Sequence, residues 1–320
     1  MRVGSTLHAT GGDDARPPIV YSQYFLNPRP SMTIPVPALI DHFSTLAPRY
    51  DVVLSDVWGV VHNGVAAFAD ACDALARFRA GGGTVILLTN APRQSEIVTG
   101  SLDRLAVPRA AYDAVVSSGD VARAVLEARR HEAVFHIGPE RDHSVFTELK
   151  IRFAPPASAD FIVCSGLFDD TTETPEDYRD LLDQLKQRNL LMVCANPDLV
   201  VERGHELVYC AGAIADLYQS MGGDVLYAGK PYRPIYEQAL ERVAALRGAQ
   251  VPLARVLAIG DSVRTDLLGA SALGVDCLFV TAGIHATELG GRETIDHGAL
   301  ADIFGEAGVL PKAVTRNLVW

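Results

Sequence analysis

The sequence predicts an α/β protein with a mostly parallel central sheet and a second, smaller α/β unit inserted into it. Short apolar runs of strand length alternate with amphipathic helical stretches, an order typical of parallel sheets with right-handed crossovers. The alternation restarts near residue 131 and returns to the first pattern near residue 227. We therefore predict a flexible tail over 1–33, a main unit built from 34–130 and 227–320, and an inserted unit over 131–226.

Composition narrows the class of function. The net charge of -11 argues against a surface that binds a nucleic-acid backbone. Five scattered cysteines, none in a Cys-x-x-Cys spacing, are typical of reduced core residues and predict a cytoplasmic protein. No apolar stretch has the length of a membrane span, and the N-terminus lacks the order of a secretory signal, with Met1 and Met32 both candidate starts. Small-molecule chemistry is favoured, with no nucleic-acid or membrane partner.

The main unit begins with a predicted helix over 36–46, because its apolar residues fall on one helical face. A buried strand then ends at Asp56. The elements that follow are a helix over 67–80, a strand over 84–88, a helix from Pro92 through Leu105, a strand over 114–117 and a helix over 120–130. The glycines of 81–83 end the first of these helices, since they tolerate positive φ.

The inserted unit repeats this alternation, and the chain then returns to the main unit. The predicted inserted elements are strands over 133–137, 161–164 and 190–194 and a helix over 175–188. The returning elements are a helix over 234–247, a strand over 256–259, a helix over 264–273 and a strand over 277–280. The segment 295–320 adds one helix, and its apolar ending at 318–320 is expected to pack on the core.

Polar residues follow several of the predicted strands. Asp56 closes the first strand, and Asp261 and Asp266 follow a later one, so they face each other if both strands are central in one sheet. Converging carboxylates suit Mg²⁺, which also takes oxygens of a substrate phosphate. A metal, a carboxylate nucleophile and the charge of Lys230 together form a phosphoryl-transfer site that works through an aspartyl-phosphate. Taken alone, such an aspartate is more often part of a strand-end turn, and such a lysine is more often a solvated surface group.

Four segments, 51–64, 88–90, 229–231 and 260–266, resemble in this order the four motifs of the haloacid dehalogenase-like (HAD) hydrolase superfamily. With the segment 195–198 they are similar to class IIA, NagD-like phosphatases over roughly residues 48–285. The resemblance implies a Rossmann-like core with an inserted C2-type cap, and a homodimer formed through the cap. It also implies Mg²⁺-dependent hydrolysis of a small phosphorylated metabolite: a nucleotide, a sugar phosphate or pyridoxal phosphate.

The resemblance also assigns roles by position. Asp56 would be the nucleophile and a metal ligand. The further metal-site residues would be the backbone carbonyl of Trp58, the carboxylate of Asp261 and, orienting the metal shell, Asp266. The residues that contact the phosphoryl group would be Thr89, Asn90 and the neutralising Lys230. Cap residues Asn196 and Asp198 lie where the family selects its substrate.

Trp58 departs from the family pattern. Family phosphatases carry an aspartate there that protonates the leaving oxygen, and tryptophan cannot transfer that proton. His62 is either a substitute acid/base or a loop histidine with no proton to move. We therefore predict a phosphatase, slowed by Trp58, with two alternatives. One is a phosphometabolite-binding protein without turnover. The other is a metal-free dehalogenase, which the acidic residues of the fourth motif disfavour.

Overall fold

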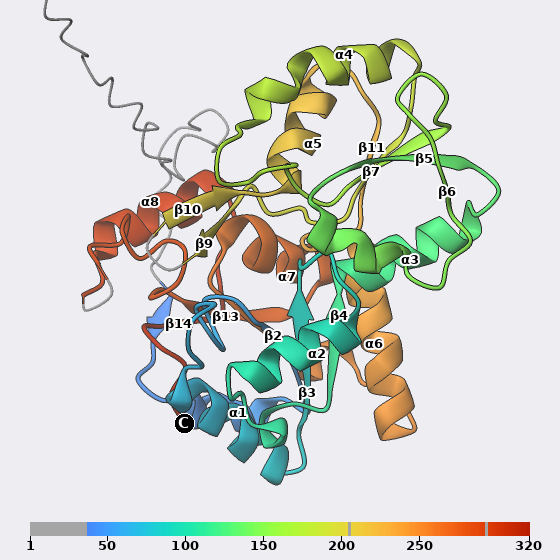
Figure 1. Cartoon of the computed structure of the whole chain (residues 1–320). Helices are drawn as coiled ribbons and strands as arrows, with labels where there is room; N and C mark the ends of the chain where they lie inside the picture. Colours follow the sequence, from blue (N-terminus) through green and yellow to red (C-terminus); the bar gives the residue numbers. More distant parts are fainter. Residues whose placement is uncertain (1–36, 204–205, 292–293) are drawn as a thin grey trace, which may run out of the picture.

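The computed structural model describes residues 37–203, 206–291 and 294–320 (Figure 1). The predicted tail, with Met1 and Met32, lies outside these residues. Within them, no helix is long and apolar enough to cross a membrane.

The main sheet has seven strands, and each neighbouring pair is parallel. Their order is β1 (Ala38–Leu39), β14 (Ala313–Thr315), β13 (Asp276–Val280), β12 (Val256–Gly260), β2 (Val52–Asp56), β3 (Thr84–Thr89) and β4 (Ala114–Ser117). β2 is buried along its whole length between β12 and β3. A strand covered on both faces needs a continuous apolar run, which explains the sequence that precedes Asp56.

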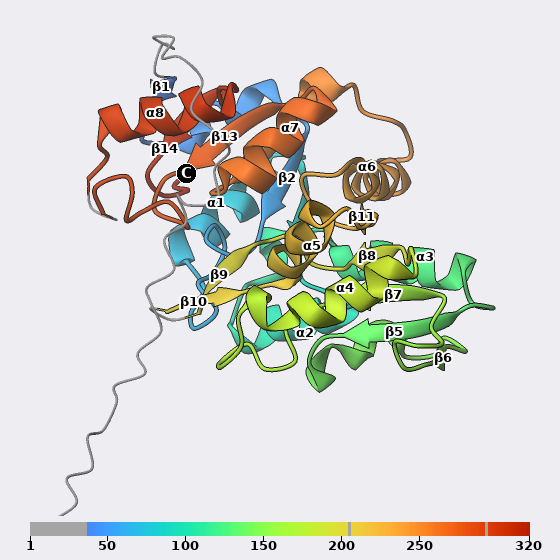
Figure 2. The ribbon, with the colours of Figure 1, turned by 90° about the horizontal axis from the view of Figure 1, so that it is seen from above.

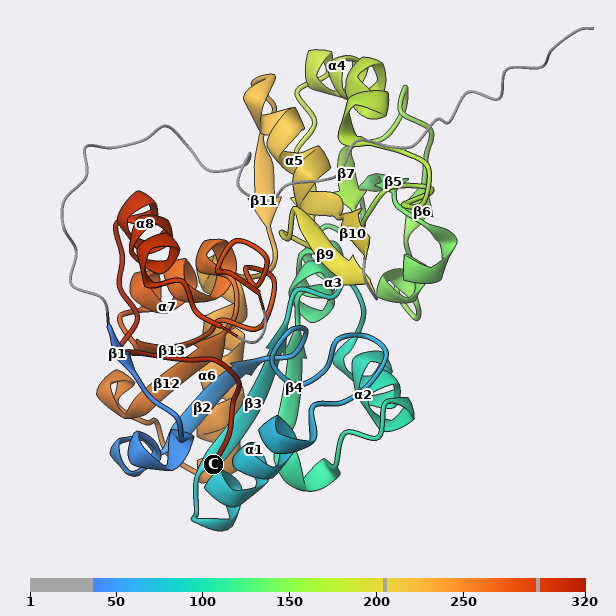
Figure 3. The ribbon, with the colours of Figure 1, turned by 90° about the vertical axis from the view of Figure 1, so that its left-hand side faces the viewer.

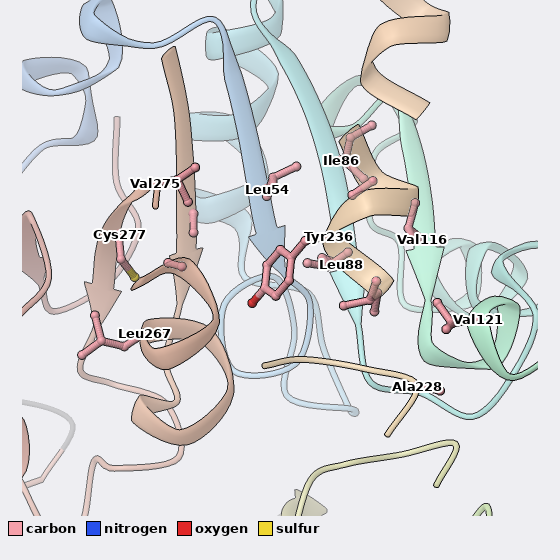
Figure 4. Close-up of a cluster of buried hydrophobic side chains, with 14 of the residues drawn as sticks. Leu54, Ile86, Leu88, Val116, Val121, Ala228, Tyr236, Leu267, Val275 and Cys277 are labelled. Carbon is pink, nitrogen blue, oxygen red and sulfur yellow. The ribbon is translucent and has the colours of Figure 1, made fainter. Parts of the chain in front are cut away.

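Helices cover both faces of the main sheet (Figure 3). One face packs against α1 (Ala69–Ala80) and α2 (Ser95–Arg104). The other face packs against α3 (Ser118–Ala128), α6 (Arg233–Arg247), α7 (Leu268–Leu273) and α8 (His297–Ala307). Figure 4 shows part of the second face, where Tyr236 of α6 lies against the side of the sheet that carries Leu54 and Leu88. Both faces of the sheet are therefore buried under helices, as the predicted alternation of strands and helices requires.

A second parallel sheet forms the cap, which Figure 2 shows beside the core. Its five strands, in order, are β11 (Val225–Tyr227), β8 (Met192–Cys194), β7 (Phe161–Cys164), β5 (Ala133–Ile137) and β6 (Arg152–Phe153). Helices α4 (Arg179–Gln187) and α5 (Ala211–Ser220) pack on one face, and the other face shares a hydrophobic cluster with α3. An antiparallel hairpin of β9 (Val200–Arg203) and β10 (Glu206–Tyr209) lies between the two sheets (Figures 1 and 3). The predicted fold class, a parallel α/β core with an inserted α/β cap, is confirmed.

One predicted element was wrong in kind, and another differs in its helix type. The segment 36–46 does not form the predicted helix over its described residues: β1 pairs with β14, and a single 3-10 turn follows at Phe43–Thr45. The side chain of Leu39, assigned to the apolar helical face, is 48% exposed. The predicted helix over 264–273 is present: it begins as a π-helical turn at Val263–Leu267 and continues as the α-helix α7.

Other elements were missed, whereas the prediction for the chain end holds. The elements that were not predicted are α5, β6, β9, β10, β11 and β14. The predicted packing of the apolar ending is confirmed, because Leu318 is buried and the Trp320 ring lies 5.8 Å from the Phe43 ring.

Candidate active site

Most of the predicted site residues gather at one edge of the main sheet. Asp56 is the last residue of β2 and Thr89 the last of β3, while Asp261 directly follows β12. These three strands are neighbours and parallel, so their carboxyl ends open onto the same space. A cavity of about 50 Å³ lies there. Its lining includes the core residues Asp56, Trp58, Thr89, Asn90, Lys230 and Asp261 and the cap residues Asp198, Val200 and Val201.

A buried lysine joins two of the carboxylates. Lys230 Nζ donates to Asp56 Oδ1 and to Asp266 Oδ1, each over 2.6 Å, and its side chain is only 3% exposed. Burial disfavours the charged ammonium, but the charges of Asp266 and Asp56 outweigh this effect and raise the pKa of Lys230 well above its ordinary value. Lys230 therefore keeps its proton at neutral pH.

Asp56, Asp261 and Asp266 form an acidic cluster, with one carboxylate oxygen of each within 4.8 Å of the others. Burial and then the charge of Asp56 raise the pKa of Asp261 well above its ordinary value, and the same two causes raise the pKa of Asp266 to about 6. Burial also raises the pKa of Asp56, against the opposing charge of Lys230. One ammonium does not balance three carboxylates, and hard oxygen donors suit a divalent cation. The residues present thus fit a divalent cation.

The backbone holds Asp261 in place. Ile284 N–H donates to Asp261 Oδ2 over 2.7 Å. Gly59 and Gly283 approach the same carboxylate so closely that a Cβ on either would lie about 2 Å from Oδ2, at 2.0 and 1.9 Å respectively. Gly59 also has a φ of +83°, which side chains rarely adopt. The two glycines therefore allow both loops to close on the carboxylate.

Asn90 connects the core to the cap. Its Oδ1 accepts from Lys230 N–H over 2.7 Å, and its Nδ2 donates to the Lys230 carbonyl over 3.1 Å. The same Nδ2 donates to Asp198 Oδ1 over 2.9 Å. Thr89 Oγ1, beside it, accepts from Ala91 N–H over 3.2 Å. Asn90 therefore fixes the segment that carries Lys230 and the cap loop that carries Asp198.

The other predicted cap residue has a different place. Asn196 is buried outside the cavity lining, where its Oδ1 accepts from Asp198 N–H over 3.1 Å. It shapes the turn that presents Asp198. Only Asp198 of this pair lines the cavity.

Trp58 and His62 lie in the loop after β2. Trp58 lines the cavity, and its ring lies edge-on to the His62 ring at 5.1 Å. His62 is 6% exposed and does not line the cavity, and its Nδ1 accepts from Gly64 N–H over 2.9 Å. Burial lowers the pKa of His62 to about 4, so the ring is neutral at pH 7. These contacts place His62 within the loop, behind Trp58 and outside the cavity lining.

His285 contributes to the site and was not predicted. It is fully buried, its Nε2 accepts from Val263 N–H over 3.3 Å, and its Nδ1 lies 2.8 Å from Glu288 Oε2. It thus supports the loop whose Ile284 N–H binds Asp261. The available signal was its position shortly after the strand over 277–280, at the carboxyl edge where the other site residues lie.

The Rossmann-like fold and the cluster of aspartates around a buried lysine are those of a HAD-type hydrolase. A model described as haloacid dehalogenase-like hydrolase matches residues 53–152, and a second HAD-hydrolase-like model matches residues 227–307. A HAD-like hydrolase from Brucella suis 1330 has a similar structure, with 45% identity and a TM-score of 0.78 over 88% of this chain and 100% of that chain. This chain belongs to the haloacid dehalogenase-like hydrolase family, as its motifs predicted.

More distant structures share the fold. A possible sugar phosphatase of the HAD superfamily from Cytophaga hutchinsonii is 20% identical, with a TM-score of 0.70 over 88% of this chain and 98% of that chain. A 4-nitrophenylphosphatase from Thermotoga maritima is also 20% identical, with a TM-score of 0.63 over 85% and 96%. A comparison with curated proteins finds no match.

Proposed function

We propose that this chain is a Mg²⁺-dependent phosphomonoester hydrolase that works through an aspartyl-phosphate on Asp56. The observation that carries the proposal is the pair of 2.6 Å contacts from Lys230 to Asp56 and Asp266 beside the third carboxylate, Asp261. A buried, fixed ammonium next to a carboxylate nucleophile offsets the negative charge that a phosphoryl group brings. Binding a neutral substrate would not require this arrangement.

Each residue then has a chemical role. A carboxylate oxygen of Asp56 attacks phosphorus, and Lys230 holds the attacking group and neutralises the phosphoryl oxygens. The Thr89 hydroxyl and the backbone at Asn90 bind the phosphoryl group. Asp56, Asp261 and the Trp58 carbonyl would hold Mg²⁺, with Asp266 orienting its shell. When bound, Mg²⁺ polarises the phosphoryl group and offsets the charge of the surrounding carboxylates.

The proposed substrate is a small phosphorylated metabolite, such as a sugar phosphate, a nucleotide or pyridoxal phosphate. The similar proteins described as a possible sugar phosphatase and a 4-nitrophenylphosphatase support a phosphate ester. Val200 and Val201 of the cap hairpin restrict the cavity, which favours a compact group next to the phosphate. We further propose that the protein dimerises through its cap.

Trp58 favours one alternative, a phosphometabolite-binding protein without turnover, because this residue lines the cavity at the chain position where the family carries a proton donor. Phosphate release from p-nitrophenyl phosphate, with and without Mg²⁺, separates the two functions. The proposal predicts Mg²⁺-dependent release that disappears in Asp56→Asn. Phosphate binding without any release from this activated ester would favour the alternative.

A further inference from the structure

The cavity has one titratable group without an assigned role. Asp56, Lys230 and Asp261 already have the proposed roles of nucleophile, neutralising cation and metal ligand, and the Trp58 indole N–H is too weak an acid to transfer its proton. The fourth titratable group in the described lining is Asp198, which the cap contributes. His62, the substitute that the sequence suggests, does not line this cavity.

Asp198 is held in a defined position. Its backbone N–H donates to Asn196 Oδ1, and its Oδ1 accepts from Asn90 Nδ2 over 2.9 Å. Within the described parts of the chain, the structure shows no hydrogen bond to its Oδ2. Asn90 also binds the backbone N–H and the carbonyl of Lys230. One amide side chain therefore holds Asp198 close to Lys230. One carboxylate oxygen therefore remains for a reacting group in the cavity.

We propose that Asp198 is the general acid and base of this site, in place of the aspartate that Trp58 replaces. The proposal rests on the phosphatase function proposed above. In the first step an Asp56 oxygen bonds to phosphorus, the ester P–O bond breaks with its electron pair on the leaving oxygen, and the Asp198 proton passes to that oxygen. In the second step water attacks phosphorus and gives a proton to Asp198. The bond to Asp56 then breaks, which releases phosphate and restores both carboxyl groups.

The electrostatic surroundings of Asp198 agree with this role. Burial raises its pKa, against the positive charge of Lys230 and the hydrogen bond from Asn90. Asp266 adds a further rise and Arg264 opposes it. The carboxyl group is therefore protonated at higher pH than an exposed aspartate. Since the cap loop supplies it, proton transfer requires the cap to be closed on the core.

The test compares wild type with Asp198→Asn, whose amide oxygen can still accept from Asn90. Turnover is measured on alkyl phosphates, which have poor leaving groups, and on p-nitrophenyl phosphate, whose leaving anion is stable. We expect Asp198→Asn to lose roughly a hundred- to ten-thousand-fold on alkyl phosphates and less than about ten-fold in the first step with p-nitrophenyl phosphate. A purely structural residue would lower both rates equally. Asp170→Asn, which removes another buried cap carboxylate outside the cavity lining, is the matched control.

The outcomes separate this inference from the proposed function. If wild type hydrolyses both esters and Asp198→Asn keeps the same ratio of rates, the role of Asp198 is overturned and the phosphatase function stands. If wild type hydrolyses neither ester, both are overturned. If Asp198→Asn does not fold, the wild-type pH profile decides. As the pH rises, the inference predicts that turnover of alkyl phosphates falls first. Formation of phosphoenzyme from p-nitrophenyl phosphate should fall only at a higher pH. Coincident pH profiles would overturn the inference.

Discussion

Replacing Lys230 by methionine should destabilise the folded protein strongly. The substitution keeps much of the side-chain length but removes the ammonium that contacts Asp56 and Asp266 over 2.6 Å each. The lysine is 3% exposed, so water cannot replace the lost charge. Breaking a buried ion pair by removing one partner costs about 3–5 kcal/mol, a large part of a typical stability of about 5–15 kcal/mol.

Urea unfolding of wild type and Lys230→Met at pH 7 measures this loss. The raised pKa of Lys230 means that its contribution is complete at pH 7 and disappears only at pH above its ordinary value. In the variant, the unpaired carboxyl groups of the folded protein bind protons at a higher pH than those of the unfolded chain. Stability of the variant should therefore recover as pH falls from about 7 towards 5.

Lys312→Met is the control, because this lysine is 42% exposed and lies 3.6 Å from Asp276, so its loss should cost about 1 kcal/mol or less. A Lys230→Met variant as stable as this control would refute the claim that the buried ion pairs hold the site together. An unchanged difference from wild type between pH 7 and 5 would refute the role of the unpaired carboxylates.

Two further predictions concern the metal and the loop after β2. Asp261→Asn should weaken Mg²⁺ binding at least about ten-fold in calorimetric titration, since it removes one of two proposed carboxylate ligands; equal affinities would contradict the metal assignment. Burial lowers the pKa of His62 to about 4, so the unfolded chain binds this proton at a higher pH than the folded protein does. The free energy of unfolding should therefore decrease as the pH falls from 6.5 towards 4. His62→Gln should remove up to about 3 kcal/mol of that acid sensitivity in urea unfolding, and an identical pH dependence in both proteins would contradict burial as its cause.

Sequence reasoning succeeded where local pattern determines structure. The apolar run before Asp56 predicted a buried strand, and the rule that parallel strands end at one edge brought Asp56 together with Asp261 and Asp266 in advance. The short strands were not predicted, because their pairing depends on residues far away in the chain. β1 pairs Ala38 with Ala313, a contact between distant segments that a two-residue pattern cannot reveal.

The remaining parts of the site depend on tertiary packing. Sequence spacing places His62 near Asp56, but only the folded loop shows that its ring lies outside the cavity and accepts a hydrogen bond from Gly64. The contact of Asn90 with Asp198 joins core and cap across 108 positions of the chain. No local signal reports the direction of those two side chains, so their pairing could not be predicted.

Rapid-quench mass spectrometry tests the central claim, that Asp56 is the nucleophile of a phosphoryl transfer, most directly. The protein is mixed with p-nitrophenyl phosphate and Mg²⁺, quenched in acid and digested, and the peptide containing Asp56 is examined. The account predicts one added phosphoryl group on Asp56, formed as p-nitrophenolate appears and absent from Asp56→Asn. Release of p-nitrophenolate at the same rate by wild type and Asp56→Asn, with no phosphoryl group on Asp56, would contradict it.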